Sequence, residues 1–93
     1  MFNFRKKYTS KTEQDLTVIT DVEVVEIEEK NKIYRYKLKN VFYCADRNGN
    51  IKMCILWGYS TFNVGDVVEM RGRYNGETFI CRRLYIRRRT TQC

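Results

Sequence analysis

The sequence contains no histidine and no proline among its 93 residues. Without histidine, neither a Ser-His nor a Cys-His nucleophile pair can form, and no imidazole can bind a metal. Without proline, no strand loses a backbone N–H donor, so strands can pair along their whole length. No stretch approaches the roughly 18 apolar residues of a membrane-spanning helix. We therefore expect no catalysis, no cofactor, no metal, no small-molecule substrate and no membrane.

The acidic residues add no reaction centre. Asp66 and Glu69 are three residues apart in a predicted strand and therefore point to opposite faces. They form no carboxylate pair for acid-base work, and the sequence predicts a protein that is not an enzyme.

The four cysteines, Cys44, Cys54, Cys81 and Cys93, contain no Cys-x-x-Cys pair, which argues against zinc. Three of them lie in apolar or alternating runs, where a reduced cysteine behaves as a small hydrophobic residue. Disulfides require an oxidising compartment. We expect free thiols and a cytoplasmic protein.

What the chain does contain is positive charge and aromatic side chains. Lys and Arg number 18 against 11 acidic residues, a net charge of +7, and 14% of the residues are aromatic. The excess lies entirely after Lys32: residues 1–32 sum to −1 and residues 33–93 to +8. Such asymmetry within one small domain predicts a basic face.

Periodicity predicts β-strands. Residues 1–14 are polar, basic and without a period, as in a flexible arm. From Leu16 the apolar residues alternate, and the alternation slips by one between Val24 and Val25. Such a slip is typical of a β-bulge in a long, bent strand. Residues 25–32 are expected to be strand running into loop.

Residues 33–46 alternate again and are followed by Asn48-Gly49, the strongest short hairpin signal. A two-residue turn there would pair Cys44 with Met53. In that register Tyr34, Tyr36 and Trp57 lie on the core face. The outer face then carries Lys37, Lys39, Tyr43 and Lys52.

The remainder predicts two more strands. A short connector over residues 58–63 leads to a strand over 67–74, and Asn75-Gly76 closes a second hairpin. The last strand covers about residues 78–87, with a bulge near Arg82-Arg83 because its alternation slips there. A basic tail, residues 88–93, ends the chain.

Residues 64–73 (VGDVVEMRGR) and 79–86 (FICRRLYI) resemble the fourth and closing strands of the OB-fold family. The resemblance covers residues 15–87 and implies an all-β, five-stranded OB-like barrel with two Asn-Gly hairpins. The helix that many members have between strands three and four is here absent or reduced to one turn. An SH3-like or Sm-like barrel is the alternative.

OB folds bind ligands across strands two and three, flanked by loops. Basic side chains that follow a backbone, with rings that stack on bases, indicate single-stranded nucleic acid. Phe62 is expected to be an exposed ring, and the arginines after residue 81 a phosphate-contacting strip. The predicted site comprises Arg35, Lys37, Lys39, Tyr43, Lys52, Tyr59, Phe62, Arg71, Arg73, Tyr74, Arg82, Arg83, Arg87 and Arg88.

The leading hypothesis is low-specificity binding of single-stranded DNA or RNA, with DNA favoured, as in small prokaryotic, plasmid or phage DNA-binding proteins that often work as dimers. Two structural interpretations stay open: one in which the lysines form only a solvated sheet face, and one in which Tyr43 covers Val41 and Leu56. The alternative function is an OB-fold protein-interaction subunit of a replication or conjugation complex. An Sm-like RNA ring subunit is a third.

Overall fold

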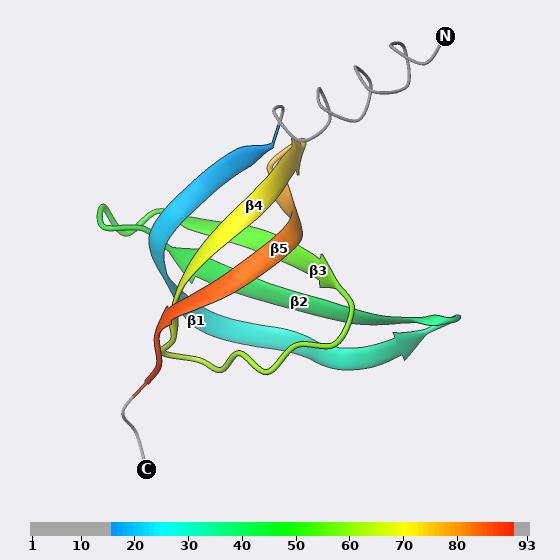
Figure 1. The fold of residues 1–93 in the computed structure, drawn as a ribbon. Coiled ribbons are helices and arrows are strands. Elements are labelled where there is room, and N and C mark those ends of the chain that lie inside the picture. Colours follow the sequence, from blue (N-terminus) through cyan, green and yellow to red (C-terminus); the bar gives the residue numbers. More distant parts are fainter. Residues whose placement is uncertain (1–15, 91–93) are drawn as a thin grey trace, which may run out of the picture.

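The computed structural model describes residues 16–90, and this part of the chain folds into five β-strands without a helix (Figure 1). The strands are β1 (Thr17–Tyr34), β2 (Lys37–Ala45), β3 (Ile51–Trp57), β4 (Val67–Asn75) and β5 (Thr78–Arg88). The all-β prediction is confirmed. The predicted arm over residues 1–14 lies outside the described residues, as do residues 91–93 of the predicted tail. Nothing between residues 16 and 90 is a helix long and apolar enough to cross a membrane.

The strands close into a barrel in the order β1-β2-β3-β5-β4, and β4 returns to β1. Only the β3–β5 pairing is parallel, and the other four pairings are antiparallel. A closed, mixed, five-stranded barrel with this strand order is OB-like, so the predicted fold class is confirmed. Closure removes the exposed strand edges that invite aggregation.

β1 is long enough to pair with two different strands and so to close the barrel. Its first part pairs with β4 and its second part with β2. The register against β2 shifts between Val24 and Glu26, at the position where the apolar alternation slips, and shifts twice more before Lys32. The predicted bulge and bend are confirmed, because each extra residue turns the strand further around the core.

The core is thin and fills the barrel. Its buried residues come from every strand and from the β3–β4 loop: Val22, Val24, Phe42, Cys44, Cys54, Leu56, Phe62, Val68, Met70, Phe79 and Cys81. Cys44, Cys54 and Cys81 are free thiols, as expected, and Cys93 lies outside the described residues. A hydrogen bond with Cys54, together with burial, raises the pKa of Cys44, and burial raises that of Cys81 to about 12. These thiols therefore act as small apolar side chains.

The β2–β3 hairpin exists, but its predicted register is wrong by one residue. Phe42 pairs with Cys54 and Lys39 with Trp57, because the loop holds three residues between Asp46 and Asn50 instead of two. Only Gly49 in this loop has positive φ, 84°, as a type I turn followed by a left-handed residue requires. A one-residue shift exchanges the faces of a strand. Trp57 therefore leaves the core face on which it was expected.

The β4–β5 hairpin and its bulge are confirmed. Asn75 pairs with Thr78, and Gly76 takes the positive φ of the turn. Arg71 pairs with Arg83 but Gly72 pairs with Cys81, so Arg82 is the extra residue of the predicted bulge. The bulge returns Leu84 and Ile86 to the interior, where they pack against the core.

The end of β1 and the turn after it, residues 25–36, differ from the predicted structure. β1 does not end in a loop near residue 30 but continues to Tyr34, and Arg35-Tyr36 form the turn into β2. This β1–β2 hairpin extends past the end of β3 (Figure 1). Tyr34 and Tyr36, expected in the core, are 52% and 100% exposed, because they lie beyond the barrel where no opposite strand covers them. We call residues 32–39 the hairpin arm.

The connection from β3 to β4 contains no helix, as the short spacing predicted. Phe62 in this loop is completely buried and packs on Phe42 with ring centroids 4.5 Å apart. The expectation that Phe62 is exposed is wrong, because the loop folds over the open end of the barrel and fills it with this ring. Phe62 is thereby removed from the candidate site.

Candidate nucleic-acid interface

An aromatic and basic cluster follows one face of the hairpin arm, from its turn to the end of β3. Tyr34 pairs with Lys37 across the β1–β2 ladder, and Lys39 pairs with Trp57 across the β2–β3 ladder. The rings of Tyr34 and Trp57 lie 5.9 Å apart, tilted by 54°. Cross-strand pairing thus brings side chains from three strands onto one surface. We call Tyr34, Arg35, Lys37, Lys39 and Trp57 the arm cluster.

Positive charges lie at the faces of these rings. Lys39 Nζ is 5.4 Å from the Tyr34 ring centre and 5.6 Å from that of Trp57, and Lys37 Nζ is 5.9 Å from Trp57. The Arg35 guanidinium is 5.8 Å from the Tyr34 ring. Exposed cation–π contacts are weak, about 0.5–1 kcal/mol each, so a ligand can replace them. Trp57 remains 39% exposed.

Two asparagines, Asn40, which is buried, and Asn31, which is half-buried, hold the arm against the barrel. The Asn40 side chain, fully buried, accepts the backbone N–H of Asn31 at 2.7 Å and donates to the carbonyls of Leu56 and Gly58. Asn31 has φ 53° and exchanges two hydrogen bonds with the backbone of Ser60. Asparagine tolerates this left-handed conformation better than most residues. The network orients the base of the arm and the strand end that carries Trp57.

The rest of the arm is exposed and partly apolar. Ile33 is 76% exposed, and Tyr36 at the turn has no protein covering it. Tyr59, also exposed, follows Trp57 by two residues, and the N–H of the intervening Gly58 donates to Leu38 on the arm. Tyr59 therefore begins the β3–β4 loop directly after the strand end that carries Trp57.

Tyr43 lies on the same outer face but next to acidic residues. Its hydroxyl donates to Glu28 at 2.9 Å, and this hydrogen bond is the main reason why the pKa of Tyr43 is raised, with burial and the charges of Glu28 and Glu26 adding to it. The carboxylates along β1 would repel a phosphate. They mark the border of the candidate interface on this side.

Lys52 and Tyr74 form a separate contact at the opposite end of β3. Lys52 was expected on the outer face, but it pairs with Cys44 and shares the inward parity of Cys54. Its ammonium donates to the Tyr74 hydroxyl at 2.9 Å, and this bond raises the pKa of Lys52 above its ordinary value. The one-residue register shift explains the error. The two residues close the mouth of the barrel near the β4–β5 turn.

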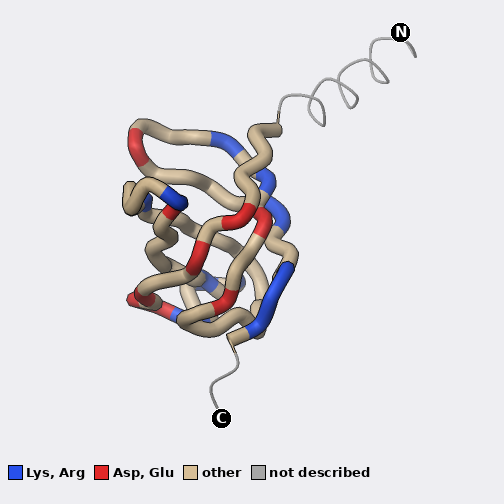
Figure 2. The backbone as a smooth tube through the Cα atoms, turned by 90° about the vertical axis from the view of Figure 1, so that its left-hand side faces the viewer, with Lys and Arg blue, Asp and Glu red and all other residues tan. Residues whose placement is uncertain are grey.

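The predicted arginines occupy a third place, the outer face of β4 and β5. Arg71, Arg73, Arg82, Arg83 and Arg87 are all exposed there. The run Arg87–Arg89 is the basic stretch directly before the C-terminal end of the described chain (Figure 2). The sequence-predicted site is thus divided by the fold into separate surfaces.

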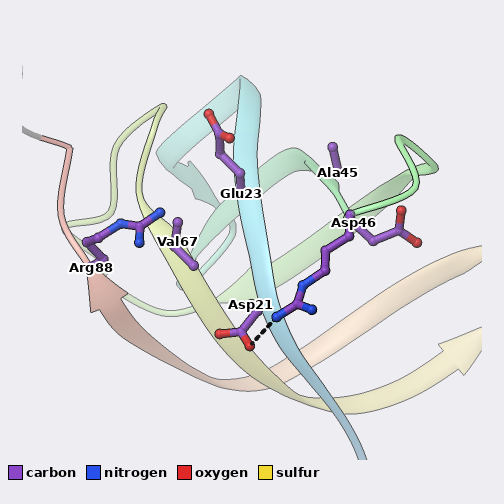
Figure 3. A pocket seen from close by; sticks show the side chains of 7 residues that line it. Asp21, Glu23, Ala45, Asp46, Val67 and Arg88 are labelled. Carbon is purple, nitrogen blue, oxygen red and sulfur yellow. Dashed lines mark ion pairs between the residues drawn. The ribbon is translucent and has the colours of Figure 1, made fainter.

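Arg88 lies apart from the other arginines, in a shallow hollow of about 380 Å³ at the end of β5. Figure 3 shows it facing Glu23 across Val67, while Arg47 makes an ion pair with Asp21 at 3.7 Å. The hollow is lined by carboxylates as well as guanidinium groups. This placement favours internal charge balance for Arg88 over a phosphate contact.

Tyr34 and Trp57 are the residues that the sequence-based site lacked. A signal for Trp57 was present: an Asp three residues before a Gly fits a three-residue loop and would have placed Trp57 opposite Lys39. Comparison of the chain with protein-family models, with curated proteins and with solved structures gives no match. The function must therefore be inferred from the surfaces themselves.

Proposed function

We propose that the protein binds single-stranded nucleic acid, DNA in preference to RNA, without catalysis and with little sequence preference, through the arm cluster. One observation carries the proposal: Tyr34 and Trp57, 5.9 Å apart, have the ammonium groups of Lys37 and Lys39 within 6 Å. Rings offer stacking surfaces to any base at about 1–3 kcal/mol each, while lysines follow the phosphates. Such a surface tolerates all sequences.

The location agrees with the fold. OB folds bind oligonucleotides across the outer surface of strands two and three, between the loops that flank it. Trp57 and Lys39 belong to β3 and β2, and Arg35 belongs to the β1–β2 turn. The proposal therefore uses the surface on which this barrel architecture commonly places its ligand.

Trp57 is the only tryptophan of the chain, and its fluorescence tests the proposal directly. Oligo-dT added in low salt should quench the emission, because a stacked base removes excited-state energy, and anisotropy of a labelled oligonucleotide should give micromolar or tighter affinity. Trp57→Ala should weaken binding about tenfold to a hundredfold, from the loss of about 1–3 kcal/mol of stacking. Trp57→Phe should retain most of the affinity.

The control is Ile51→Ala, an exposed apolar residue at the other end of β3 that should leave affinity unchanged. Lys37→Ala with Lys39→Ala should reduce the salt dependence of binding, since two phosphate contacts are lost. Competition between oligo-dT and oligo-U tests the preference for DNA. Affinity that is equal in Trp57→Ala and the parent protein would refute the site.

A protein-interaction subunit of a replication or conjugation complex is the second candidate. The observation that favours it is the exposed apolar side chains of Ile33 and Tyr36 on the arm. Exposed apolar groups projecting from a barrel suit docking on a protein, including a second copy of this chain. Sedimentation distinguishes the two functions: a stable oligomer unaffected by oligonucleotide supports docking, and a species that changes only with oligonucleotide supports nucleic-acid binding.

A further inference from the structure

We propose that the outer face of β4 and β5 is a second nucleic-acid surface, which holds the phosphate backbone of another segment while the arm cluster holds the first. We call Arg71, Arg73, Arg82, Arg83 and Arg87 the arginine face. The inference rests on the proposed function, because it assumes that nucleic acid is the ligand. It adds that one chain holds two segments at once.

The topology separates the two surfaces. β4 pairs with β1 and β5 and has no pairing with β2 or β3, so it lies on the far side of the closed barrel from the β2–β3 surface. Figure 1 shows β4 and β5 crossing in front of the barrel, with β2 and β3 behind it. A short oligonucleotide held on the arm cluster therefore leaves the arginine face free.

The positive charges of the arginine face lie close enough together to destabilise the sheet by repulsion. β5 carries four arginines and no acidic residue. Arg71 and Arg83 are directly paired across the β4–β5 ladder, and like charges at such positions destabilise a sheet. Within the same face, Glu69 makes an ion pair with Arg71 at 3.3 Å.

The type of side chain indicates phosphate. All five basic residues of this face are arginine, whereas the arm cluster relies on two lysines. The planar guanidinium matches phosphate with two parallel hydrogen bonds, which an ammonium group cannot offer. Arginines bound to phosphate hold the backbone of the nucleic acid and carry no sequence information.

The arginine face has one ring against the two of the arm cluster. That ring is Tyr85, 40% exposed, and the Arg71 guanidinium lies 5.8 Å from it. Tyr85 pairs with Glu69, so a carboxylate adjoins it. A single ring beside a carboxylate is a poorer stacking surface than the Tyr34–Trp57 pair. The arginine face is therefore suited mainly to the phosphate backbone.

The backbone beneath the arginines is held rigidly. Arg82 is the bulged residue, which leaves Gly72 in close contact with Ile80 and Cys81. After Arg87–Arg89, the N–H of Thr90 donates to the buried carboxylate of Asp66 at 2.8 Å. A fixed scaffold lowers the entropy lost when the guanidinium groups bind.

The test is the number of short oligonucleotides that one chain binds. Oligo-dT of about six nucleotides, near the lower size of one OB site, is titrated in low salt and the complexes are counted by native mass spectrometry. Two molecules per chain are expected. Arg71→Gln with Arg87→Gln should leave one molecule bound, preserve the quenching of Trp57, and reduce the salt slope by about 0.7 for each contact removed.

The matched control is Lys30→Gln with Arg47→Gln, which removes the same charge from outside both surfaces and should keep two molecules bound. Trp57→Ala with Lys39→Ala should also leave one molecule, held by the arginines. A parent protein that binds one molecule, with normal Trp57 quenching, overturns the second surface and leaves the proposed function intact. A parent protein that binds no oligonucleotide and shows no quenching of Trp57 overturns the proposed function instead. Thermal melts verify that each variant is folded.

Discussion

The arm cluster and the arginine face are both positively charged, but they differ in the side chains that they present and in the strands that carry those side chains. The arm cluster combines lysines with two partly exposed rings on a hairpin that extends past the barrel. The arginine face combines guanidinium groups with one partly exposed ring beside a carboxylate, on strands that pair along nearly their whole length. The first surface is suited to stacking bases and the second to following a phosphate backbone. Equal charge therefore does not imply an equal ligand.

The supports of the two surfaces can be tested in turn, and the largest loss of stability is expected beneath the arginines. In Gly72→Ala, the new Cβ would lie 2.0 Å from the carbonyl oxygen of Ile80 and 3.0 Å from the Cα of Cys81. Both atoms belong to the backbone of β5, so β4 and β5 must separate. We expect the free energy of unfolding, measured in urea, to fall by about 3 kcal/mol or more.

Gly49→Asn is the matched control, since no atom lies within 4 Å of that site and asparagine tolerates its positive φ. It should lose far less stability. Because the barrel is closed, Gly72→Ala should weaken both surfaces together. A variant that keeps normal stability would show that the β4–β5 contact is looser than the structure has it.

A smaller, local effect is expected at the base of the arm. Asn40→Ala leaves the Asn31 N–H and the carbonyls of Leu56 and Gly58 without their shared partner. Unsatisfied buried groups cost about 1–3 kcal/mol, so we expect a loss of about 2 kcal/mol. The arm should loosen, and acrylamide should quench Trp57 more strongly. The oligonucleotide bound by the arginine face should remain.

Asn40→Asp keeps the acceptor for the Asn31 N–H but places a carboxylate oxygen against the carbonyls of Leu56 and Gly58 in a fully buried site. A buried charge without a partner is costly, so this variant should lose at least as much stability as Asn40→Ala, and its affinity for oligo-dT should fall as far. Equal losses on both surfaces in Asn40→Ala would mean that the arm and the arginine face are not independent.

The sequence predicted the features that depend on neighbouring residues and missed those that depend on loop length or on the closure of the barrel. The five strands, both Asn-Gly hairpins and the bulge at Arg82 follow from local alternation and turn residues, whereas the continuation of β1 to Tyr34 does not. The position of Trp57 depends on the number of loop residues after Asp46, and an Asn-Gly pair fits either count. Phe62 depends on how a loop covers the barrel end, which no local pattern encodes. The arginine face was visible as composition, and only the topology separated it from the arm.

The β2–β3 loop gives the smallest predicted effect and tests the register that brings Trp57 to Lys39. The Asp46 carboxylate accepts the backbone N–H groups of Asn50 and Asn48 at 3.0 and 2.9 Å, and these bonds lower its pKa. A lowered folded-state pKa means that this stabilisation is present above the ordinary aspartate value, about 3.9, and is lost as the pH falls through the lowered pKa.

Asp46→Asn should therefore melt slightly below the parent protein at pH 7, and the two melting curves should converge as the pH falls through the lowered pKa of Asp46, below which both side chains are neutral. Asp21→Asn removes an equal charge from an exposed ion pair with Arg47 and controls for net charge. Because the amide of asparagine still accepts one N–H, the register should hold and oligo-dT should still quench Trp57. A difference in melting temperature that persists unchanged at low pH would show that the carboxylate charge does not stabilise this loop.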